Sequence, residues 1–150
     1  MKIVDYFDCE NKSYWLEKIG ESDWRSGKYL YDLLKSNQLS IKVGLNPQVL
    51  MLIDTNELLA FCTLSQKKYD IASSLTPWLG CVYTFPKYRG RRYSEKLIKH
   101  AEKLVCETGL DGIYVSTKHI GLYEKYGFSY YGIIADWRNE EQRIYFKSAT

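Results

Sequence analysis

The chain of 150 residues is poor in the features that mark several specialised classes of protein. It has only three prolines and ten glycines, and 45% of its residues are apolar, which argues against a disordered or linker-divided chain. Its longest apolar runs, 49–53 and 58–62, are far shorter than the ~20 residues that cross a bilayer. The first residues carry charges in place of a signal peptide's apolar segment. We therefore expect a soluble, cytoplasmic protein with no membrane partner.

Cysteine and histidine are also scarce. The two histidines do not stand at metal-ligand spacing, and the cysteines form no CxxC pair. We expect no metal site, and reduced cysteines that mostly behave as small buried apolar side chains. The four are Cys9, Cys62, Cys81 and Cys106.

Neither sign of charge is in large excess, because the chain has 21 Lys and Arg residues and 18 Asp and Glu residues. A net charge of +3 is too small to indicate a nucleic-acid partner by itself. The length suits one domain, residues 1–150, which is large enough to bury its own core. Although the overall charge is nearly balanced, positive charge is concentrated at Lys87, Arg89, Arg91 and Arg92, and this cluster could bind an anionic ligand.

The stretch 78–109 combines a strand, a tight turn and a long helix. Apolar and β-favouring residues lead to Pro86, where a central strand must end. After a basic turn, apolar residues recur at helical spacing from Tyr93 to Val105, and Gly109 supplies a C-terminal cap. A helix start presents unpaired N–H groups and a positive dipole end. This turn therefore predicts a phosphate site, against the simpler alternative of a solvated basic turn.

Hydrophobic periodicity predicts the other elements and their order. It indicates helices at 11–20, 24–37 and 119–127, a hairpin of strands 48–54 and 58–65, and further strands at 113–117, 128–134 and 143–147. Because a helix connects strands 79–85 and 113–117, these two should be parallel neighbours. The order predicts an α/β fold: a single three-layer domain with a mixed central β-sheet and helices on both faces.

This order and a first motif resemble the GNAT superfamily of acyl-CoA-dependent N-acyltransferases. The motif is the run PKYRGRRYS at 86–94, which is similar to that family's pyrophosphate loop, Q/R-x-x-G-x-G/A. Arg89 fits the first position, but Arg92 replaces the usual glycine and Ser94 the usual glycine or alanine. Glycine lets backbone approach a phosphate closely, so Arg92 either points away or contacts a phosphate itself.

The second motif, LYEKYGF at 122–128, resembles the family's LYEKxGF signature. The resemblance implies that Tyr123 is the general acid that protonates the departing CoA thiolate. This is chemically reasonable, because a phenol and an alkyl thiol have comparable proton affinities and the phenol is protonated at neutral pH. The alternative is a packed tyrosine whose hydroxyl is satisfied within the protein.

The resemblance implies acetyl-CoA as co-substrate and direct transfer of the acetyl group to an amine, with no acyl-enzyme. Pantetheine would lie between the two parallel strands, and a backbone N–H near Val82 and Tyr83 would stabilise the oxyanion. The strand carries no Glu or Asp to serve as base, so His119 is the candidate substitute, placed four residues before Tyr123 on the expected helix. The alternative for His119 is a capping or buried structural role. The implied cofactor-binding residues are Val82, Tyr83, Thr84, Phe85, Arg89, Gly90, Arg91, Arg92, Tyr93 and Ser94.

The acceptor site in this family is built from the first helices and the late hairpin. Here that implies Trp24, Tyr29, Asp136 and Trp137, an aromatic and acidic lining that would suit a small cationic amine such as a polyamine or an amino sugar, with a peptide amine as the alternative. Core packing is the alternative for the aromatic residues. The sequence leaves the oligomeric state open between a monomer and a homodimer, although dimers are frequent in the family.

Two other functions fit parts of the sequence. An acyl-CoA sensor would keep the fold and lose catalysis, as the departures at Arg92 and Ser94 allow. An RNA-binding module would use the basic turn with its interleaved aromatic residues, although no RNP1-like pattern is present. A Walker-type nucleotide site is excluded, because the loop lacks a second glycine followed by Lys and Ser or Thr.

Overall fold

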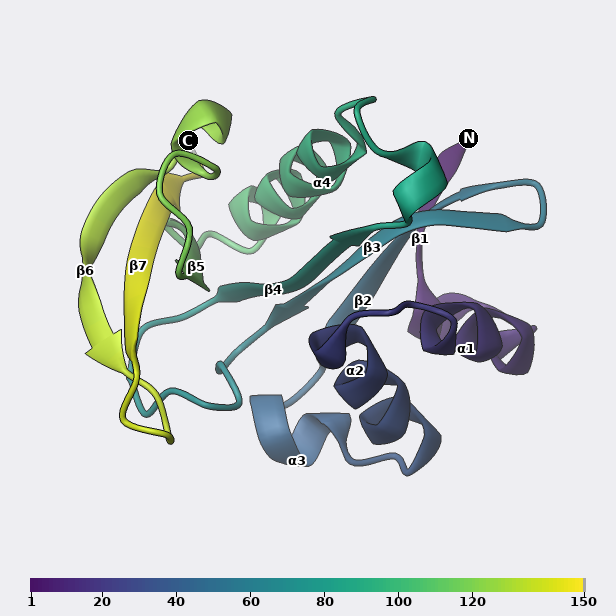
Figure 1. Cartoon of the computed structure of the whole chain (residues 1–150), viewed down its shortest axis with the longest axis horizontal. Coiled ribbons are helices and arrows are strands. Elements are labelled where there is room, and N and C mark those ends of the chain that lie inside the picture. The colour runs from purple at the N-terminus through teal and green to yellow at the C-terminus, as the bar shows by residue number, and fades with distance from the viewer. Residues whose placement is uncertain (150) are drawn as a thin grey trace.

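The computed structural model describes residues 1–149 and contains one seven-stranded sheet in the order β1-β2-β3-β4-β5-β7-β6 (Figure 1). The strands are β1 (Lys2–Asp5), β2 (Gln48–Asp54), β3 (Glu57–Ser65), β4 (Trp78–Thr84), β5 (Gly112–Thr117), β6 (Ser129–Ala135) and β7 (Glu141–Ser148). The helices are α1 (Lys12–Gly20), α2 (Arg25–Lys35), α3 (Leu39–Val43) and α4 (Tyr93–Glu107), with 3₁₀ turns η1 (Tyr6–Asp8), η2 (Pro86–Tyr88) and η3 (Glu124–Tyr126).

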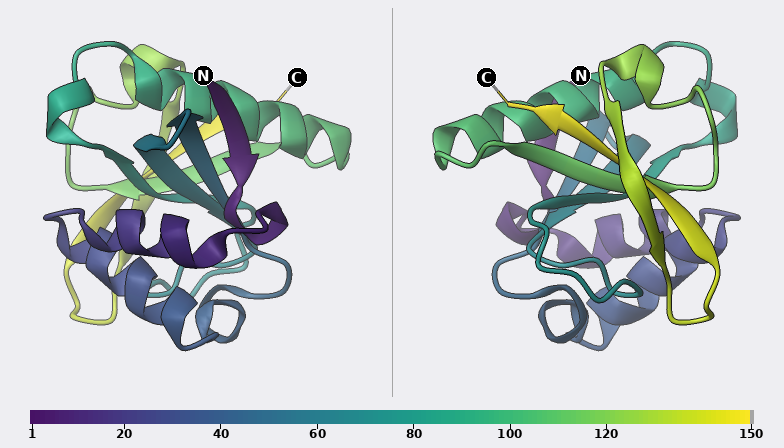
Figure 2. Two further views of the ribbon diagram at one scale, coloured as in Figure 1. Left: turned by 90° about the vertical axis from the view of Figure 1, so that its right-hand side faces the viewer. Right: turned by 90° about the vertical axis from the view of Figure 1, so that its left-hand side faces the viewer.

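The elements form three layers, as the sequence predicts. Helix α4 covers one face of the sheet, and α1, α2 and α3 cover the other (Figure 2). All neighbouring strands are antiparallel except β4 and β5, which run parallel on either side of the α4 connection. The expected α/β fold with a mixed sheet is confirmed.

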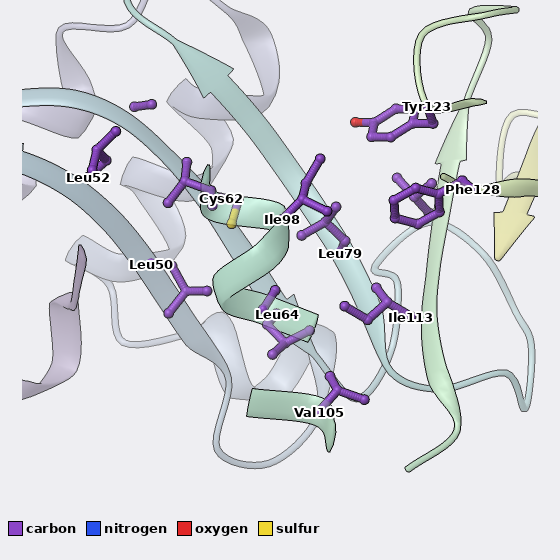
Figure 3. Close-up of a cluster of buried hydrophobic side chains, with 14 of the residues drawn as sticks. Leu50, Leu52, Cys62, Leu64, Leu79, Ile98, Val105, Ile113, Tyr123 and Phe128 are labelled. Carbon is purple, nitrogen blue, oxygen red and sulfur yellow. The ribbon is translucent and has the colours of Figure 1, made fainter. Parts of the chain in front are cut away.

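Two apolar clusters join the layers, one on each face of the sheet. On the α4 face, the periodic positions of that helix meet side chains from β2, β3, β4 and β5 (Figure 3). On the other face, the apolar stripes of α1 and α2 pack against β2, β3 and Tyr83 of β4. The helix residues involved are Leu97, Ile98, Ala101 and Val105 of α4, and Trp15, Ile19, Leu30, Leu33 and Leu34 of α1 and α2.

Three local features differ from the sequence-based expectation. The short edge strand β1 and the five-residue helix α3 were not predicted, because neither is long enough to show a period. The predicted helix at 119–127 is wrong: only the single 3₁₀ turn Glu124–Tyr126 forms there. Gly121 has φ +91, outside the helical region, and its N–H is bound by the Glu124 carboxylate instead of by a helical carbonyl.

Strands β4 and β5 separate soon after they start. Within residues 1–149 they pair only at Trp78 with Tyr114 and at Leu79 with Val115. A bulge around Cys81, whose φ is +49, then shifts the register of β4 against β3. In Figure 3 the two strands diverge upward from the level of Leu79 and Ile113. The expected opening between the parallel strands is present.

Gly112, at the start of β5, gives a direct test of this packing. A Cβ atom there would overlap the Lys147 carbonyl oxygen and the Phe146 ring, whereas one at Gly132 in β6 would meet nothing within 4 Å. We expect Gly112→Ala to destabilise the fold by about 1–3 kcal/mol, the usual cost of overpacking, because backbone cannot move aside freely. Urea denaturation measures the loss, with Gly132→Ala as the matched control. Equal midpoints for the two variants would contradict the β5–β7 packing described.

Candidate active site

A cleft of about 1250 Å³ opens where β4 and β5 separate. Residues 79–84 of β4 and the C-terminal half of β5, 115–117, line it. The loop from η2 into α4 and the turn containing Tyr123 border one part of it. The loops before α2, between β3 and β4, and between β6 and β7 border the rest. Five separate stretches of sequence, within 23–26, 68–70, 79–94, 115–126 and 136–142, therefore share one cavity.

Most of the predicted site residues line this cleft. Three do not: Phe85 packs beside Tyr83 and faces a separate hollow, Tyr29 lies in a small cavity under α2 against Tyr69, and Arg91 lines no part of the cleft. The predicted residues that the cleft brings together are Trp24, Val82, Tyr83, Thr84, Arg89, Gly90, Arg92, Tyr93, Ser94, His119, Tyr123, Asp136 and Trp137.

The N-terminus of α4 reaches the cleft through an unusual turn. Gly90 and Arg92 have φ +84 and +58, so the chain turns through two left-handed residues before the helix begins. Arg92 therefore adopts the backbone conformation that glycine usually supplies. Its guanidinium lies 3.0 and 2.6 Å from the two carboxylate oxygens of Glu95. Of the two orientations that the sequence allowed, the structure has the side chain paired along the helix.

The same loop is tied to the end of β4. The Arg89 side chain donates from Nε to the Thr84 carbonyl oxygen at 2.8 Å, and its guanidinium lies 5.4 Å from the ring centroid of Tyr83. The hydroxyls of Ser94 and Thr84 are 3.2 Å apart. The first N–H groups of α4 are thus held beside the strand end, where an anion would meet both the helix dipole and a guanidinium.

Tyr123 occupies the mouth of the opening between β4 and β5. Its side chain is 8% exposed and packs edge-on against Phe128, with 5.5 Å between ring centroids. In Figure 3 the hydroxyl lies on the β4 side of the ring. No residue in 1–149 gives that hydroxyl a hydrogen-bond partner, although it lines the cleft. Burial raises the pKa of Tyr123, so the phenol is a protonated donor at neutral pH.

The far part of the cleft has aromatic walls. Trp24 stacks on Tyr83 with 5.6 Å between ring centroids and 11° between ring planes. Trp137 meets Tyr69 edge-on at 6.2 Å, and its backbone N–H donates to the Asp70 carbonyl oxygen at 3.0 Å. This last bond joins the β6–β7 loop to the β3–β4 loop.

Family comparisons agree with this geometry. The sequence profile described as acetyltransferase (GNAT) domain matches residues 46–130, which include β4, the Arg89–Ser94 loop and Tyr123. This chain belongs to the GNAT acetyltransferase family. No curated protein matches the sequence.

Solved structures share the fold of this GNAT domain at low sequence identity. The aminoglycoside 6'-N-acetyltransferase from Enterococcus faecium is 13% identical with a TM-score of 0.72, covering 100% of this chain and 98% of that one. An aminoglycoside 6'-N-acetyltransferase complexed with coenzyme A is 15% identical with a TM-score of 0.69 and the same coverage. An acetyltransferase from Streptococcus agalactiae is 17% identical with a TM-score of 0.66, covering 98% and 97%. These likenesses establish the fold.

Asp136 has a structural task in this GNAT domain. Its side chain is buried, Oδ1 accepts from the backbone N–H groups of Arg138 and Glu140, and Oδ2 accepts from the Gln142 amide. Burial by itself would raise the pKa of Asp136, but these bonds and the Arg138 charge hold it below its ordinary value. The carboxylate therefore shapes the β6–β7 loop at the edge of the cleft.

His119 is an exposed residue of the cleft wall. Its backbone N–H donates to Thr117 Oγ1 at 3.0 Å in the bend that replaces the predicted helix. The prediction that His119 and Tyr123 share one helical face is therefore wrong, although both residues line the same cleft.

The cleft also contains residues that the sequence did not point to. Asp23, Lys68, Tyr69 and Asp70 line its far part. They come from two loops without periodicity or motif, so no sequence signal marked them. Within residues 1–149 no group of His, Cys, Asp or Glu side chains could hold a metal ion, and no helix is long and apolar enough to span a membrane.

Proposed function

We propose that this GNAT acetyltransferase transfers the acetyl group of acetyl-CoA directly to a primary amine of a small molecule or peptide. The observation that carries the proposal is the Tyr123 hydroxyl, a protonated donor without a partner in residues 1–149, at the opening between β4 and β5. A free, buried proton donor at that place suits a leaving group that must be protonated.

The residues present fit acetyl-CoA as co-substrate. The first N–H groups of α4, together with Arg89, would bind the pyrophosphate, and Lys125 adds a further positive charge to the lining of the same cleft. Beyond Leu79, β4 pairs with β3 but not with β5, so its backbone groups on the β5 side could bind the pantetheine amides. The cleft also exceeds the roughly 300–1,000 Å³ of an ordinary small-molecule pocket, as a ligand of this length requires.

The chain's own groups supply the remaining chemistry. The acceptor amine forms a bond to the acetyl carbonyl carbon, and a backbone N–H near Val82 and Tyr83 stabilises the oxyanion. The carbon–sulfur bond then breaks, and Tyr123 gives its proton to the sulfur. His119, exposed on the wall, is our candidate to accept the amine proton directly or through water.

An acyl-CoA sensor of the same fold is the second candidate. The pairing of Arg92 with Glu95 takes that charge out of direct phosphate contact, which favours weaker or altered cofactor binding. The RNA-binding alternative loses support, because Tyr83 is only 6% exposed and cannot stack on bases.

The first experiment is an amine screen for CoA release, using a thiol reagent to detect the product. The panel would contain tryptamine, spermidine, L-lysine and kanamycin, the last because two similar structures are aminoglycoside acetyltransferases. We expect saturable CoA release above hydrolysis with at least one amine. Thermal stabilisation by acetyl-CoA without turnover of any amine would favour the sensor.

A homodimer and a cytoplasmic location stay predictions. The edge strand β6 is the surface we expect a second copy to use, because it has no charged residue or proline and exposes Tyr130, Tyr131 and Ile133. Antiparallel pairing about Gly132 would set Tyr131 opposite Ile133 of the second copy, an aromatic and β-branched pair.

A further inference from the structure

Three carboxylates line the cleft, and two of them are already neutralised. Asp70 pairs with Lys68 at 2.8 Å. Asp136 lies 3.6 Å from the Arg138 guanidinium and accepts three further hydrogen bonds. Asp23 alone of the three forms no ion pair within residues 1–149. An uncompensated carboxylate in a binding cleft is a place for a cationic ligand.

Asp23 is also held in a fixed orientation. The Tyr83 hydroxyl donates to Asp23 Oδ1 at 2.8 Å, across 60 positions of sequence. Burial and this bond raise the pKa of Tyr83, so the phenol stays a donor. Tyr83 is itself fixed by packing against Phe61 and Phe85. The second oxygen of Asp23, Oδ2, has no partner in the part of the chain that the structure describes.

The surroundings of Asp23 suit an ammonium group on an apolar body. The adjacent Trp24 lays its ring parallel to Tyr83, which gives an aromatic face beside the carboxylate. Three of the cationic side chains that line the cleft are already paired: Lys68 with Asp70, Lys118 with Glu140, and Arg138 with Asp136 and Glu140. A second or third ammonium on the ligand would therefore find no further uncompensated carboxylate among the three that line the cleft.

We propose that Asp23 binds the ammonium group of the acceptor, and that the acceptor is a primary amine on an apolar or aromatic body. This inference rests on the proposed acetyl transfer. Asp23 binds the acceptor in its ammonium form, and the proton that leaves before attack goes to His119 directly or through water, as proposed above. The carboxylate comes from the loop before α2 and is oriented by a β4 tyrosine.

The test is steady-state kinetics of Asp23→Asn with acetyl-CoA and tryptamine. Asparagine keeps the shape of the side chain and an oxygen for the Tyr83 hydroxyl, but removes the charge. We expect KM for tryptamine to rise at least tenfold, with kcat and the acetyl-CoA Kd changed less than threefold. Asp32→Asn, on an exposed position of α2 outside the cleft, is the control and should match the wild type. Tyr83→Phe should raise KM in the same direction by a smaller factor.

The outcomes separate this inference from the proposed function. Unchanged KM in Asp23→Asn, or a loss of kcat alone, would overturn the assignment of Asp23 while acetyl transfer stands. A higher kcat/KM for spermidine or kanamycin than for tryptamine would overturn the acceptor class. Absence of CoA release by the wild type with every amine would instead overturn the proposed function, and this inference with it. Melting temperatures show whether each variant is folded.

Discussion

Replacement of Tyr123 by phenylalanine should lower kcat by roughly 10- to 1000-fold, the range expected when a general acid is removed. Acetyl-CoA affinity should stay almost unchanged, because the proton transfer concerns only the leaving thiolate. The fold should tolerate the change well, since the ring contacts with Phe128 remain and the hydroxyl has no partner to lose within residues 1–149. The loss is therefore expected in chemistry and not in stability.

Single-turnover kinetics and an acetyl-CoA titration measure the two effects separately. Tyr130→Phe removes the same hydroxyl from an exposed position of β6 outside the cleft and should behave as the wild type. Because burial raises the pKa of Tyr123, the wild-type rate should not fall through phenol ionisation below about pH 10, the ordinary tyrosine value. A Tyr123→Phe enzyme with wild-type kcat would remove this residue from the mechanism.

Ser94→Asp should raise the Kd for acetyl-CoA at least tenfold. Position 94 lies in the first turn of α4 and lines the cleft, so a carboxylate there would repel the pyrophosphate. The same carboxylate interacts favourably with the helix dipole, by about 0.3–1 kcal/mol, which works against any loss of folding. Weaker binding in a variant of undiminished stability would therefore report the phosphate site directly.

Ser94→Ala is the matched control for this charge. It removes only the contact with the Thr84 hydroxyl and restores a residue usual in the family loop, so its Kd should stay within about threefold of the wild type. Calorimetric titration at low and high salt adds a second criterion. Because salt screens the repulsion, the difference in acetyl-CoA Kd between Ser94→Asp and the wild type should be smaller at high salt. Equal affinities of the two variants at low salt would place the pyrophosphate elsewhere.

The loop at 86–94 has Arg92 where the family motif usually has glycine. The sequence marked Arg92 as atypical and left two orientations open. The structure shows that the backbone still adopts the left-handed turn and that Glu95, three residues on, holds the guanidinium. This pairing could have been anticipated from i,i+3 spacing on a helix, but the left-handed backbone of a nonglycine residue could not.

The helix predicted at 119–127 does not form, for a local reason that periodicity does not show. Leu122, Tyr123 and Tyr126 have helical spacing, yet Gly121 lies outside the helical region and Thr117 and Glu124 bind backbone N–H groups through their side chains. Side chains that satisfy the backbone locally compete with the helix, and periodicity does not detect them. The LYEKYGF motif singled out Tyr123, and the structure places this residue in the lining of the cleft although the predicted helix does not form.

The sequence by itself determined the layered α/β fold, the loop into α4 and the position of Tyr123 in the chain, because apolar periodicity, glycine and proline act over neighbouring residues. Only the tertiary structure decided where the far part of the cleft lies and what lines it. Asp23 and Tyr83 meet across 60 positions, and Trp137 reaches Asp70 through a loop contact. Such contacts depend on how β4 and β5 diverge and on which loops then close the gap, which no local pattern encodes.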